Sequence, residues 1–380
     1  MVTLNAKEQL KLDVVSKVFT GKIKFETAIK ILNCSARTLY RYLKKFKLEG
    51  ALFVKHKNTG NRPANKTSLE LEKNIVGICK DRYHDFNRTH ALEFLNEKEK
   101  IKIPKDTFNR ICNRNNILKK RLKKRRSKIK RRRDRMPEQG LMIQLDGSPH
   151  RWFGLRKTCL LIAIDDANSE IIYGEFSPTE TTFACMNVIK GVLKNRGSFE
   201  VLYVDKAGIY GRDQQSLFST KRDGFSNMKE RLKTYDIKVI FAHSPEAKGR
   251  VERAFNTLQD RLVAELRFNN INTLEDANKY LREVYIPSHN RRFSIPNVAS
   301  SYVPVIGDID KEFYMSIKRI IKNDHTFRNE NKLYDIQSNK TNYSGKEVEI
   351  RSYTDGKVLY FVDDIEISLA EVKEKQANAG

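Results

Sequence analysis

The sequence predicts a multidomain protein with N-terminal all-α helix-turn-helix units, a central α/β domain with a mixed five-stranded sheet, and a small C-terminal all-β barrel. Apolar residues recur at helical spacing over the first 115 residues, short apolar runs follow from about residue 138, and turn-separated strands return after Pro296. We therefore expect a helix-turn-helix domain over residues 1–54, a linker over 55–67, a second helix-turn-helix-like domain over 68–118, a basic linker over 119–137, an α/β core over 138–295 and the β domain over 296–380.

The first 54 residues carry a helix-turn-helix pattern. Helices are predicted over Ala6–Phe19 and Phe25–Leu32, and Ser35 is the expected N-cap of a third helix that ends near Leu48. A short basic helix after a tight turn suits insertion into the major groove of DNA. An ordinary three-helix bundle with a solvated basic face is the alternative. The candidate DNA contacts on this helix are Arg37, Thr38, Tyr40, Arg41 and Lys44.

The second helical unit is followed by a run of cations. Its last helix is expected to begin with Pro104 at the first helical position and to bury Phe108 and Ile111. In residues 119–135 only four of seventeen residues are neither Lys nor Arg, so the run repels itself and suits an arm lying on phosphates. The candidate contacts in this arm are Lys124, Arg125, Arg126, Arg131 and Arg132.

The core is expected to contain five strands and a helix after the third of them. The predicted strands are Leu141–Asp146, Cys159–Asp165, Ile171–Phe176, Val201–Asp205 and Lys238–Phe241, and the helix is Thr181–Leu193. This order indicates a mixed sheet. In the C-terminal domain, strands are predicted at Ile317–Ile321, Leu333–Ile336, Val348–Arg351 and Val358–Val362, which suggests the small barrel.

The overall charge and the cysteines narrow the class of protein. A formal net charge of +26 predicts a polyanionic partner, although a merely basic protein is the alternative. There is no apolar run of about 18 residues and no evident signal peptide, so we expect a cytoplasmic protein without a membrane partner. The cysteines form no CxxC pair and have no nearby histidine, which favours buried free thiols over a zinc site or disulfides. They are Cys34, Cys79, Cys112, Cys159 and Cys185.

Three acidic residues stand where a metal site could form. Asp146 and Asp205 end predicted strands, and Glu252 enters a long helix. Side chains at strand ends project into the crevice of an α/β sheet. Carboxylates suit Mg²⁺, and two ions about 3.5–4 Å apart can stabilise the attacking and leaving oxygens of phosphodiester transfer. We expect these residues to hold two Mg²⁺ ions per site, for which Mn²⁺ can substitute.

The helix after the third acid has a clear apolar stripe. Val251, Phe255, Leu258 and Leu262 form that stripe, which leaves Glu252 on a neighbouring face with Asn256 and Gln259. The two amides are expected to touch DNA, with a solvated helix surface as the alternative. The cations Lys248, Arg250 and Arg253 are the candidate phosphate contacts here.

Other residues near these motifs have more ordinary interpretations. Asp165 and Asp166 end the second strand, where a turn-capping or structural role is favoured over metal binding. Trp152 and Phe153 are expected to form a hydrophobic lid, with base stacking as the alternative.

The acidic motifs resemble those of a known family. Gln144-Leu145-Asp146-Gly147-Ser148, Val204-Asp205-Lys206-Ala207-Gly208 and the segment from Pro245 to Arg253 are similar to the three motifs of DDE-type insertion-sequence transposases in the retroviral integrase superfamily. His289-Asn290-Arg291-Arg292 resembles the segment that closes this core in bacterial members. The resemblance implies an RNase H-like integrase core and an SH3-like barrel behind it.

The resemblance also implies an activity. Such an enzyme binds transposon ends, hydrolyses phosphodiester bonds to free 3′-OH ends, and joins them to target DNA by metal-dependent transesterification. It implies a homodimer or higher oligomer on double-stranded DNA in a bacterial cytoplasm, associated with the nucleoid. The sequence departs from the pattern after Asp205, which lacks the usual Asn-Gly, and in an inserted polar stretch over Gly211–Gly224. An inactive DNA-binding regulator and a structure-specific RNase H-like nuclease are the alternatives.

Overall fold

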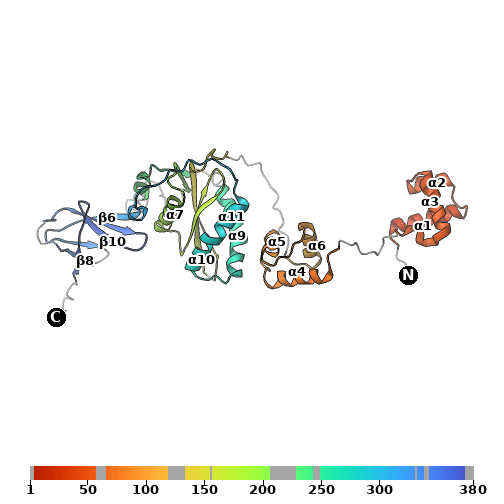
Figure 1. The fold of residues 1–380 in the computed structure, drawn as a ribbon, viewed down its shortest axis with the longest axis horizontal. Helices are drawn as coiled ribbons and strands as arrows, with labels where there is room; N and C mark the ends of the chain where they lie inside the picture. The colour runs from red at the N-terminus through yellow and green to blue at the C-terminus, as the bar shows by residue number, and fades with distance from the viewer. Residues whose placement is uncertain are drawn as a thin grey trace, which may run out of the picture. The chain divides into compact units, whose positions relative to one another are not determined.

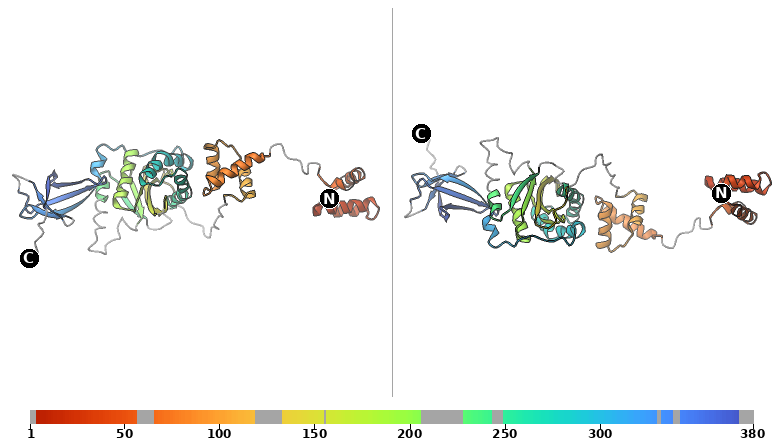
Figure 2. Two further views of the ribbon diagram at one scale, coloured as in Figure 1. Left: turned by 90° about the horizontal axis from the view of Figure 1, so that it is seen from below. Right: turned by 90° about the horizontal axis from the view of Figure 1, so that it is seen from above.

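The computed structural model describes residues 4–56, 66–118, 133–154, 156–205, 228–242, 249–329, 332–337 and 342–372 (Figures 1 and 2). Residues 1–73 form one compact unit and residues 74–380 another. None of the helices within the described ranges is long and apolar enough to cross a bilayer.

The first unit is a small helical bundle. It contains α1 (Ala6–Phe19), α2 (Phe25–Leu32), α3 (Ala36–Glu49) and a 3₁₀ turn, Gly50–Val54. Val15, Ala28 and Leu39 are fully buried in its core. The Ser35 side chain accepts a hydrogen bond from the Thr38 amide at 3.3 Å, which confirms the predicted N-cap of α3.

The next three helices are α4 (Leu69–Asp81), α5 (Arg88–Glu97) and α6 (Lys105–Arg114). Phe108 and Ile111 are buried, as predicted. The prediction that Pro104 begins α6 was wrong by one residue. Its ψ of 142° lies outside the helical region, so Pro104 is the cap residue and Lys105 begins the helix.

The centre of the second unit is a mixed five-stranded sheet, as predicted. Its strands are β1 (Met142–His150), β2 (Thr158–Asp165), β3 (Ile171–Ser177), β4 (Val201–Asp205) and β5 (Lys238–Ala242). Their order is β3-β2-β1-β4-β5. β2 is antiparallel to β1 and to β3, whereas β4 is parallel to β1 and to β5.

β1 is longer than the sequence predicts. We expected it to end at Asp146, but it continues to His150 because Gly147 to His150 pair with β2 residues as far as Thr158. Asp146 is therefore paired with Ile162 inside the antiparallel ladder. The antiparallel ladder with β2 continues past Asp146, whereas the parallel ladder with β4 ends at Gln144.

Helices cover both faces of the sheet (Figure 1). α7 (Thr182–Asn195) packs on one face, where its Met186, Val188 and Ile189 are fully buried. On the other face lie α9 (Gly249–Phe268), α10 (Leu274–Tyr280), the π-helical turn Leu281–Tyr285 and α11 (Ile286–Phe293). This layering places α9 alongside β1.

Two asparagine side chains close the free edge of β3. Asn290 of α11 accepts from the Ile171 amide at 3.0 Å and donates to the Ile171 carbonyl at 2.9 Å. Asn278 of α10 makes the same pair of bonds with Phe176, at 2.7 and 3.0 Å. Both ends of the outer strand are thus hydrogen-bonded to helices and not to another strand.

The C-terminal region contains a short helix, α12 (Ile309–Glu312), and two antiparallel sheets. One sheet has the order β11-β10-β9-β6 and the other β12-β8-β7. The strands are β6 (Tyr314–Ile320), β7 (Thr326–Asn329), β8 (Lys332–Ile336), β9 (Glu347–Tyr353), β10 (Val358–Val362), β11 (Ile365–Glu366) and β12 (Leu369–Val372). The four predicted strands are present. Among the described residues no strand pairing joins the two sheets, so closure of the barrel stays a prediction.

The cysteines are free thiols. Cys79, Cys112, Cys159 and Cys185 are buried, as predicted, and Cys34 is half-buried.

Candidate active site

Asp146 and Asp205 lie on neighbouring parallel strands. The ladder between β1 and β4 pairs Gln144 with Tyr203. Continued for two residues past the end of this ladder, the same register would bring Asp146 level with Asp205. Neighbouring strands are about 4.8 Å apart, so this register suits two carboxylates that share a metal. For Asp205 the structure describes the backbone alone.

α9 runs alongside β1 and is anchored to it at two points. At one point Gln259 donates to the Ser148 hydroxyl at 3.1 Å. At the other, the same Oδ1 atom of Asp166 accepts from Arg250 at 2.8 Å and from Gln144 at 2.6 Å. The anchors are nine residues apart on α9 and four apart on β1, roughly 13 to 14 Å in each case. The helix and the strand therefore run in the same direction.

Asp146 and Glu252 lie between these two anchors. Gln144, Asp146 and Ser148 share one face of β1, because successive side chains of a strand alternate. Glu252 is exposed in the first turn of α9, two residues after Arg250, and Asp146 is half-buried. The anchors thus hold the strand and the helix that carry two of the predicted metal ligands side by side.

The donor set suits a hard cation, since carboxylate oxygens at a partly open position are the ligands that Mg²⁺ prefers. Among the described side chains, no group of three or more His, Cys, Asp or Glu is placed to hold a metal. The Asp205 carboxylate, the third predicted ligand, lies outside that set.

A further acid that sequence reasoning missed lies beside β1. The Glu180 carboxylate comes within 2.8 Å of the position that a Cβ atom would occupy on Gly147. Because side chains alternate, this position faces α7, whereas Asp146 faces α9. Burial, with the charges of Glu180 and Asp146, raises the pKa of the Cys159 thiol to about 12. This thiol is therefore protonated and inert at neutral pH.

The apolar stripe of α9 is confirmed, because Val251, Phe255, Leu258 and Leu262 are buried. Asn256 is exposed and donates to the Glu252 carbonyl at 2.9 Å. Arg253 is also exposed and donates to the Gly249 carbonyl at 2.7 Å. Arg250, predicted to contact phosphate, is largely buried and is ion-paired with Asp166. Lys248 and the arm residues Lys124, Arg125, Arg126, Arg131 and Arg132 lie outside the described residues.

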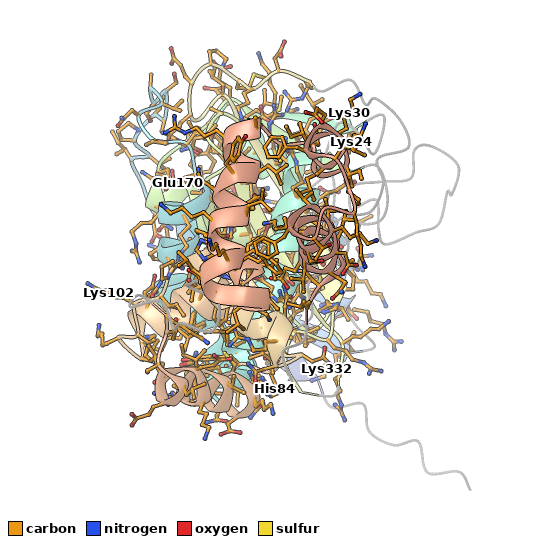
Figure 3. All side chains as sticks on the ribbon, turned by 90° about the vertical axis from the view of Figure 1, so that its right-hand side faces the viewer. Lys24, Lys30, His84, Lys102, Glu170 and Lys332 are labelled. Atoms are coloured by element: carbon orange, nitrogen blue, oxygen red, sulfur yellow. The ribbon has the colours of Figure 1, made fainter. Side chains whose placement is uncertain are left out.

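The candidate DNA-binding face of α3 is exposed. Arg37, Tyr40, Arg41 and Lys44 point to solvent, and Thr38 is half-buried next to Ser35. Lys24 and Lys30, at the start and near the end of α2, add exposed positive charge to the same unit (Figure 3).

The more ordinary interpretations of Trp152 and Asp165 are confirmed. Trp152 is fully buried, donates to the Ser148 carbonyl at 2.9 Å and packs against Phe176, so it is not available for base stacking. Asp165 is fully buried and accepts from the amides of Gly140 and Ala167, each at 2.9 Å. Burial raises its pKa.

The sequence matches no protein-family model. It is 28% identical over 400 residues to the transposase for insertion sequence IS1202 of Streptococcus pneumoniae, covering 96% of this chain and 84% of that protein. It is 27% identical over 367 residues to y4bF of Sinorhizobium fredii, whose name calls it a transposase, covering 94% of this chain and 79% of that protein.

The chain is similar to insertion-sequence transposases over nearly its whole length.

Two solved structures are distantly similar to this chain. One is the HTLV-2 integrase catalytic core domain in complex with magnesium, at 16% identity and a TM-score of 0.29, covering 39% of this chain and 89% of that one. The other is a chain of the simian T-cell lymphotropic virus intasome in complex with the PP2A regulatory subunit B56 gamma, at 11% identity and a TM-score of 0.34, covering 79% of this chain and all of that one.

The second helical unit, α4 to α6, packs against α9, the helix that carries Glu252. Fully buried His90 of α5 is 2.9 Å from the Glu265 carboxylate, which also accepts from the Tyr280 hydroxyl at 2.7 Å. At the end of α9, the ring of Phe268 packs against those of Tyr83 and Phe94. Sequence reasoning missed this interface, because its polar partners are about 170 residues apart in the chain.

Further ion pairs extend the same interface. Arg261 of α9 makes two bonds to Glu93 of α5, at 2.6 and 3.2 Å. Burial alone would raise the pKa of Glu93, but Arg261 and Arg292 lower it overall. Arg267 likewise makes two bonds to Asp85, at 2.7 and 2.6 Å. These charged side chains of the second helical unit therefore form ion pairs with α9 of the same chain.

The His289-Asn290-Arg291-Arg292 segment has separate structural duties. Asn290 closes the edge of β3, and Arg292 bonds Glu97 of α5 at 2.6 Å. Burial and the charges of Arg261 and Arg292 lower the pKa of His289 to about 4, which keeps it neutral. This segment thus joins the sheet to the second helical unit.

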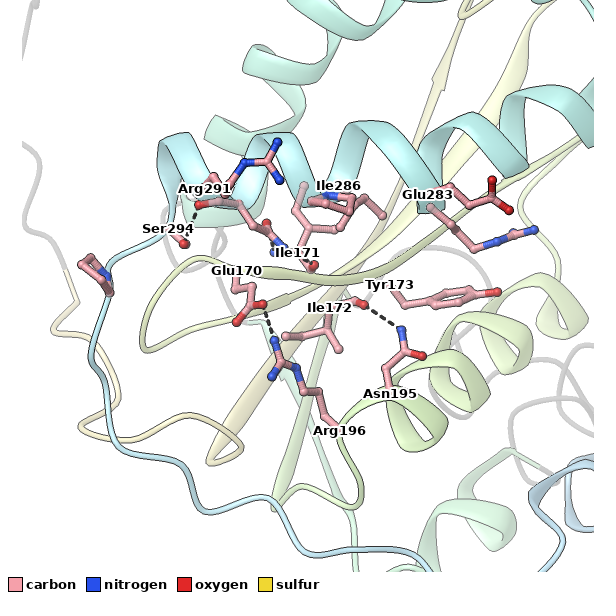
Figure 4. Close-up of a pocket in the computed structure, with 14 residues that line it drawn as sticks. Glu170, Ile171, Ile172, Tyr173, Asn195, Arg196, Glu283, Ile286, Arg291 and Ser294 are labelled. Atoms are coloured by element: carbon pink, nitrogen blue, oxygen red, sulfur yellow. Dashed lines mark hydrogen bonds and ion pairs between the residues drawn. The ribbon is translucent and has the colours of Figure 1, made fainter.

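The edge of β3 also borders a pocket of about 850 Å³ (Figure 4). Arg196 and Glu170 form an ion pair across it, and Asn195 bonds the Ile172 carbonyl at 3.3 Å. It is lined by residues of β3, α7 and α11 and none of the predicted metal ligands, so it is separate from the candidate active site.

Proposed function

We propose that this chain is a DDE transposase that hydrolyses phosphodiester bonds at transposon ends to free 3′-OH groups and joins these ends to target DNA by transesterification. The observation that carries the proposal is the placement of Asp146 and Glu252 between the two anchors of α9 on β1. The register that brings Asp205 level with Asp146 supports it. Similarity to insertion-sequence transposases over nearly the whole chain supports the same reaction class.

In this proposal Asp146, Asp205 and Glu252 hold two Mg²⁺ ions, for which Mn²⁺ can substitute. The bound ions supply positive charge at the attacking and leaving oxygens of an in-line displacement. The chain's own residues orient the DNA. Asn256 and Gln259 follow Glu252 along the same helix face, and the exposed Arg253 is placed to contact a phosphate.

The remaining regions supply DNA binding. Arg37, Thr38, Tyr40, Arg41 and Lys44 read the major groove of the terminal repeats, and the arm over residues 119–137 neutralises phosphates. We assign residues 1–54 and 68–118 to helical domains, 138–295 to an RNase H-like core and 296–380 to an SH3-like barrel. Because two ends must be joined together, the working form is a dimer or higher oligomer on double-stranded DNA.

Strand transfer by Asp146→Asn tests the proposal. With oligonucleotides that carry the terminal repeats of the element and with Mg²⁺, we expect end cleavage and joining to fall by at least about a thousandfold, because a metal ligand is lost. Asp236→Asn is the matched control. It neutralises an exposed acid in the turn before β5, at a positive φ that asparagine tolerates, and should keep full activity.

The other outcomes of this assay are informative. Undiminished joining by Asp146→Asn would overturn the metal-site assignment. If the wild-type chain binds terminal-repeat DNA but never cleaves it, the chain is a DNA-binding regulator. Preferential cleavage of RNA–DNA hybrids would identify it as a structure-specific nuclease.

A further inference from the structure

Asp166 is a buried carboxylate that joins several separate segments of the chain. It is fully buried directly after β2. Its Oδ1 atom accepts from Gln144 of β1 at 2.6 Å and from Arg250 of α9 at 2.8 Å, and its Oδ2 atom accepts from the Met136 amide at 3.0 Å. The Arg133 guanidinium, from the end of the basic run, is a further partner.

Two of these partners lie next to the candidate metal ligands. Gln144 precedes Asp146 by two residues and shares its face of β1. Arg250 precedes Glu252 by two residues in the first turn of α9. The other anchor, between Gln259 and Ser148, is about two helical turns from Glu252. Asp166 is therefore the closer of the two anchors to Glu252.

The charge of Asp166 gives this anchor its strength. Arg250 is largely buried, and burial lowers its pKa while Asp166 opposes that effect. A second bond from Arg250, to the Arg133 carbonyl at 2.9 Å, uses the same guanidinium. The first turn of a helix has unsatisfied amides and frays readily unless it is held. Without Asp166, the first turn of α9 would lose its ionic attachment to β1.

We propose that Asp166 is a positioning residue for metal binding: by holding Gln144 and Arg250 on one oxygen, it sets the separation of Asp146 and Glu252. This inference rests on the proposed function. Residues that orient metal ligands from behind commonly change metal affinity by about 10- to 100-fold when they are altered. Asp166 would change metal affinity indirectly, because it holds β1 and α9, which carry Asp146 and Glu252.

Asp165 provides a matched comparison in the same turn. It is equally buried and also accepts several hydrogen bonds, from Gly140, Ala167 and the Tyr302 hydroxyl. These partners lie in the segment before β1, in the turn after β2 and in the segment before α12. None of them is within two residues of a candidate metal ligand. Loss of charge at Asp165 should therefore reduce stability without moving Glu252.

The test measures Mn²⁺ binding to the full chain in the absence of DNA, by the loss of the free Mn²⁺ signal in electron paramagnetic resonance. We expect Asp166→Asn to raise the Mn²⁺ dissociation constant by about tenfold or more. Asp165→Asn should change it by less than about twofold, even if thermal unfolding shows that both variants are similarly destabilised. Equal Mn²⁺ affinities for the two variants would overturn the inference.

A second variant keeps the test decisive if Asp166→Asn does not fold. Arg250→Gln removes the ionic arm to α9 and leaves Arg133 to neutralise Asp166, so it should also weaken Mn²⁺ binding about tenfold. Because DNA is absent, a lost phosphate contact of Arg250 cannot cause this change. Wild-type Mn²⁺ affinity in Arg250→Gln would contradict the inference.

Asp146→Asn separates this inference from the proposed function. If that variant binds Mn²⁺ as the wild-type chain does, the metal site itself is wrong. If it loses Mn²⁺ binding while Asp166→Asn keeps it, the metal site stands and only the role of Asp166 fails.

Discussion

The two N-terminal helical regions have the same number of helices but use their polar residues differently. In α1–α3 the charged side chains of α3 point to solvent, and Ser35 bonds only within its own turn. In α4–α6 the charged side chains of α5 bond α9 and α11, and Asn87, which caps α5, also donates to Asp260 of α9 at 2.6 Å. The charged side chains of α3 therefore face solvent, whereas those of α5 bind other parts of the chain.

This difference shows why two helix-turn-helix patterns in a sequence need not bind DNA alike. The charged partners on α5 are the carboxylates Glu93 and Glu97, which bind Arg261 of α9 and Arg292 of α11 and would repel phosphate. Helices α4 to α6 instead pack against the C-terminal half of α9, the helix that carries Glu252. Variants that separate stability from DNA affinity can break or sharpen this comparison.

The largest expected effect is that of Glu265→Ala. This change leaves His90 and the Tyr280 hydroxyl buried without their shared acceptor, so the free energy of unfolding of the second unit should fall by about 3 to 5 kcal/mol. Chemical denaturation of the full chain would measure the loss. Glu275→Ala, an exposed acid of α10, is the control and should change stability by less than about 0.5 kcal/mol. A loss in Glu265→Ala no larger than in this control would mean that α5 does not depend on α9.

A matched pair of N-cap variants should give an intermediate effect. Ser35→Ala removes a cap alone and should cost about 1 kcal/mol in the first unit. Asn87→Ala removes a cap and the bond to Asp260, and should cost about 2 kcal/mol in the second unit. Hydrogen–deuterium exchange of the α3 and α5 amides would report each loss separately. Equal losses would show that the bond between α5 and α9 adds no stability.

The smallest expected effect on stability is that of changes on the exposed face of α3, which should alter DNA binding alone. Arg41→Ala combined with Lys44→Ala should weaken binding to terminal-repeat DNA by about tenfold and reduce its salt dependence by the equivalent of about two phosphate contacts. Thermal unfolding should stay the same, because both side chains are exposed. The matched double variant Lys98→Ala with Lys102→Ala, beyond α5, should bind DNA as the wild-type chain does. A larger loss from the second pair would reverse the comparison.

Periodic features of the fold could be predicted from the sequence. The helices of the first unit follow from apolar spacing and a serine cap, and the stripe of α9 follows from its heptad-like pattern. The strands of the core were found for the same reason. Short strands such as β7, β11 and β12 were missed, because two to four residues are too few to show an alternating pattern.

The candidate site could be predicted only in part. Asp146 and Glu252 were found from their positions at a strand and a helix. The partners of Asp166 come from three segments between residues 133 and 250, and such polar contacts leave no periodic signal. For that reason Arg250 was predicted to contact phosphate, whereas its guanidinium is bound within the protein.

The two asparagines of α10 and α11 that bind the edge of β3 have a consequence for aggregation. An outer strand with free amides and carbonyls is a template on which another chain can add a strand, and this is a common beginning of aggregation. Here Asn278 and Asn290 occupy the outward main-chain groups of Phe176 and Ile171. A strand from another copy therefore cannot pair with the sheet at these two positions.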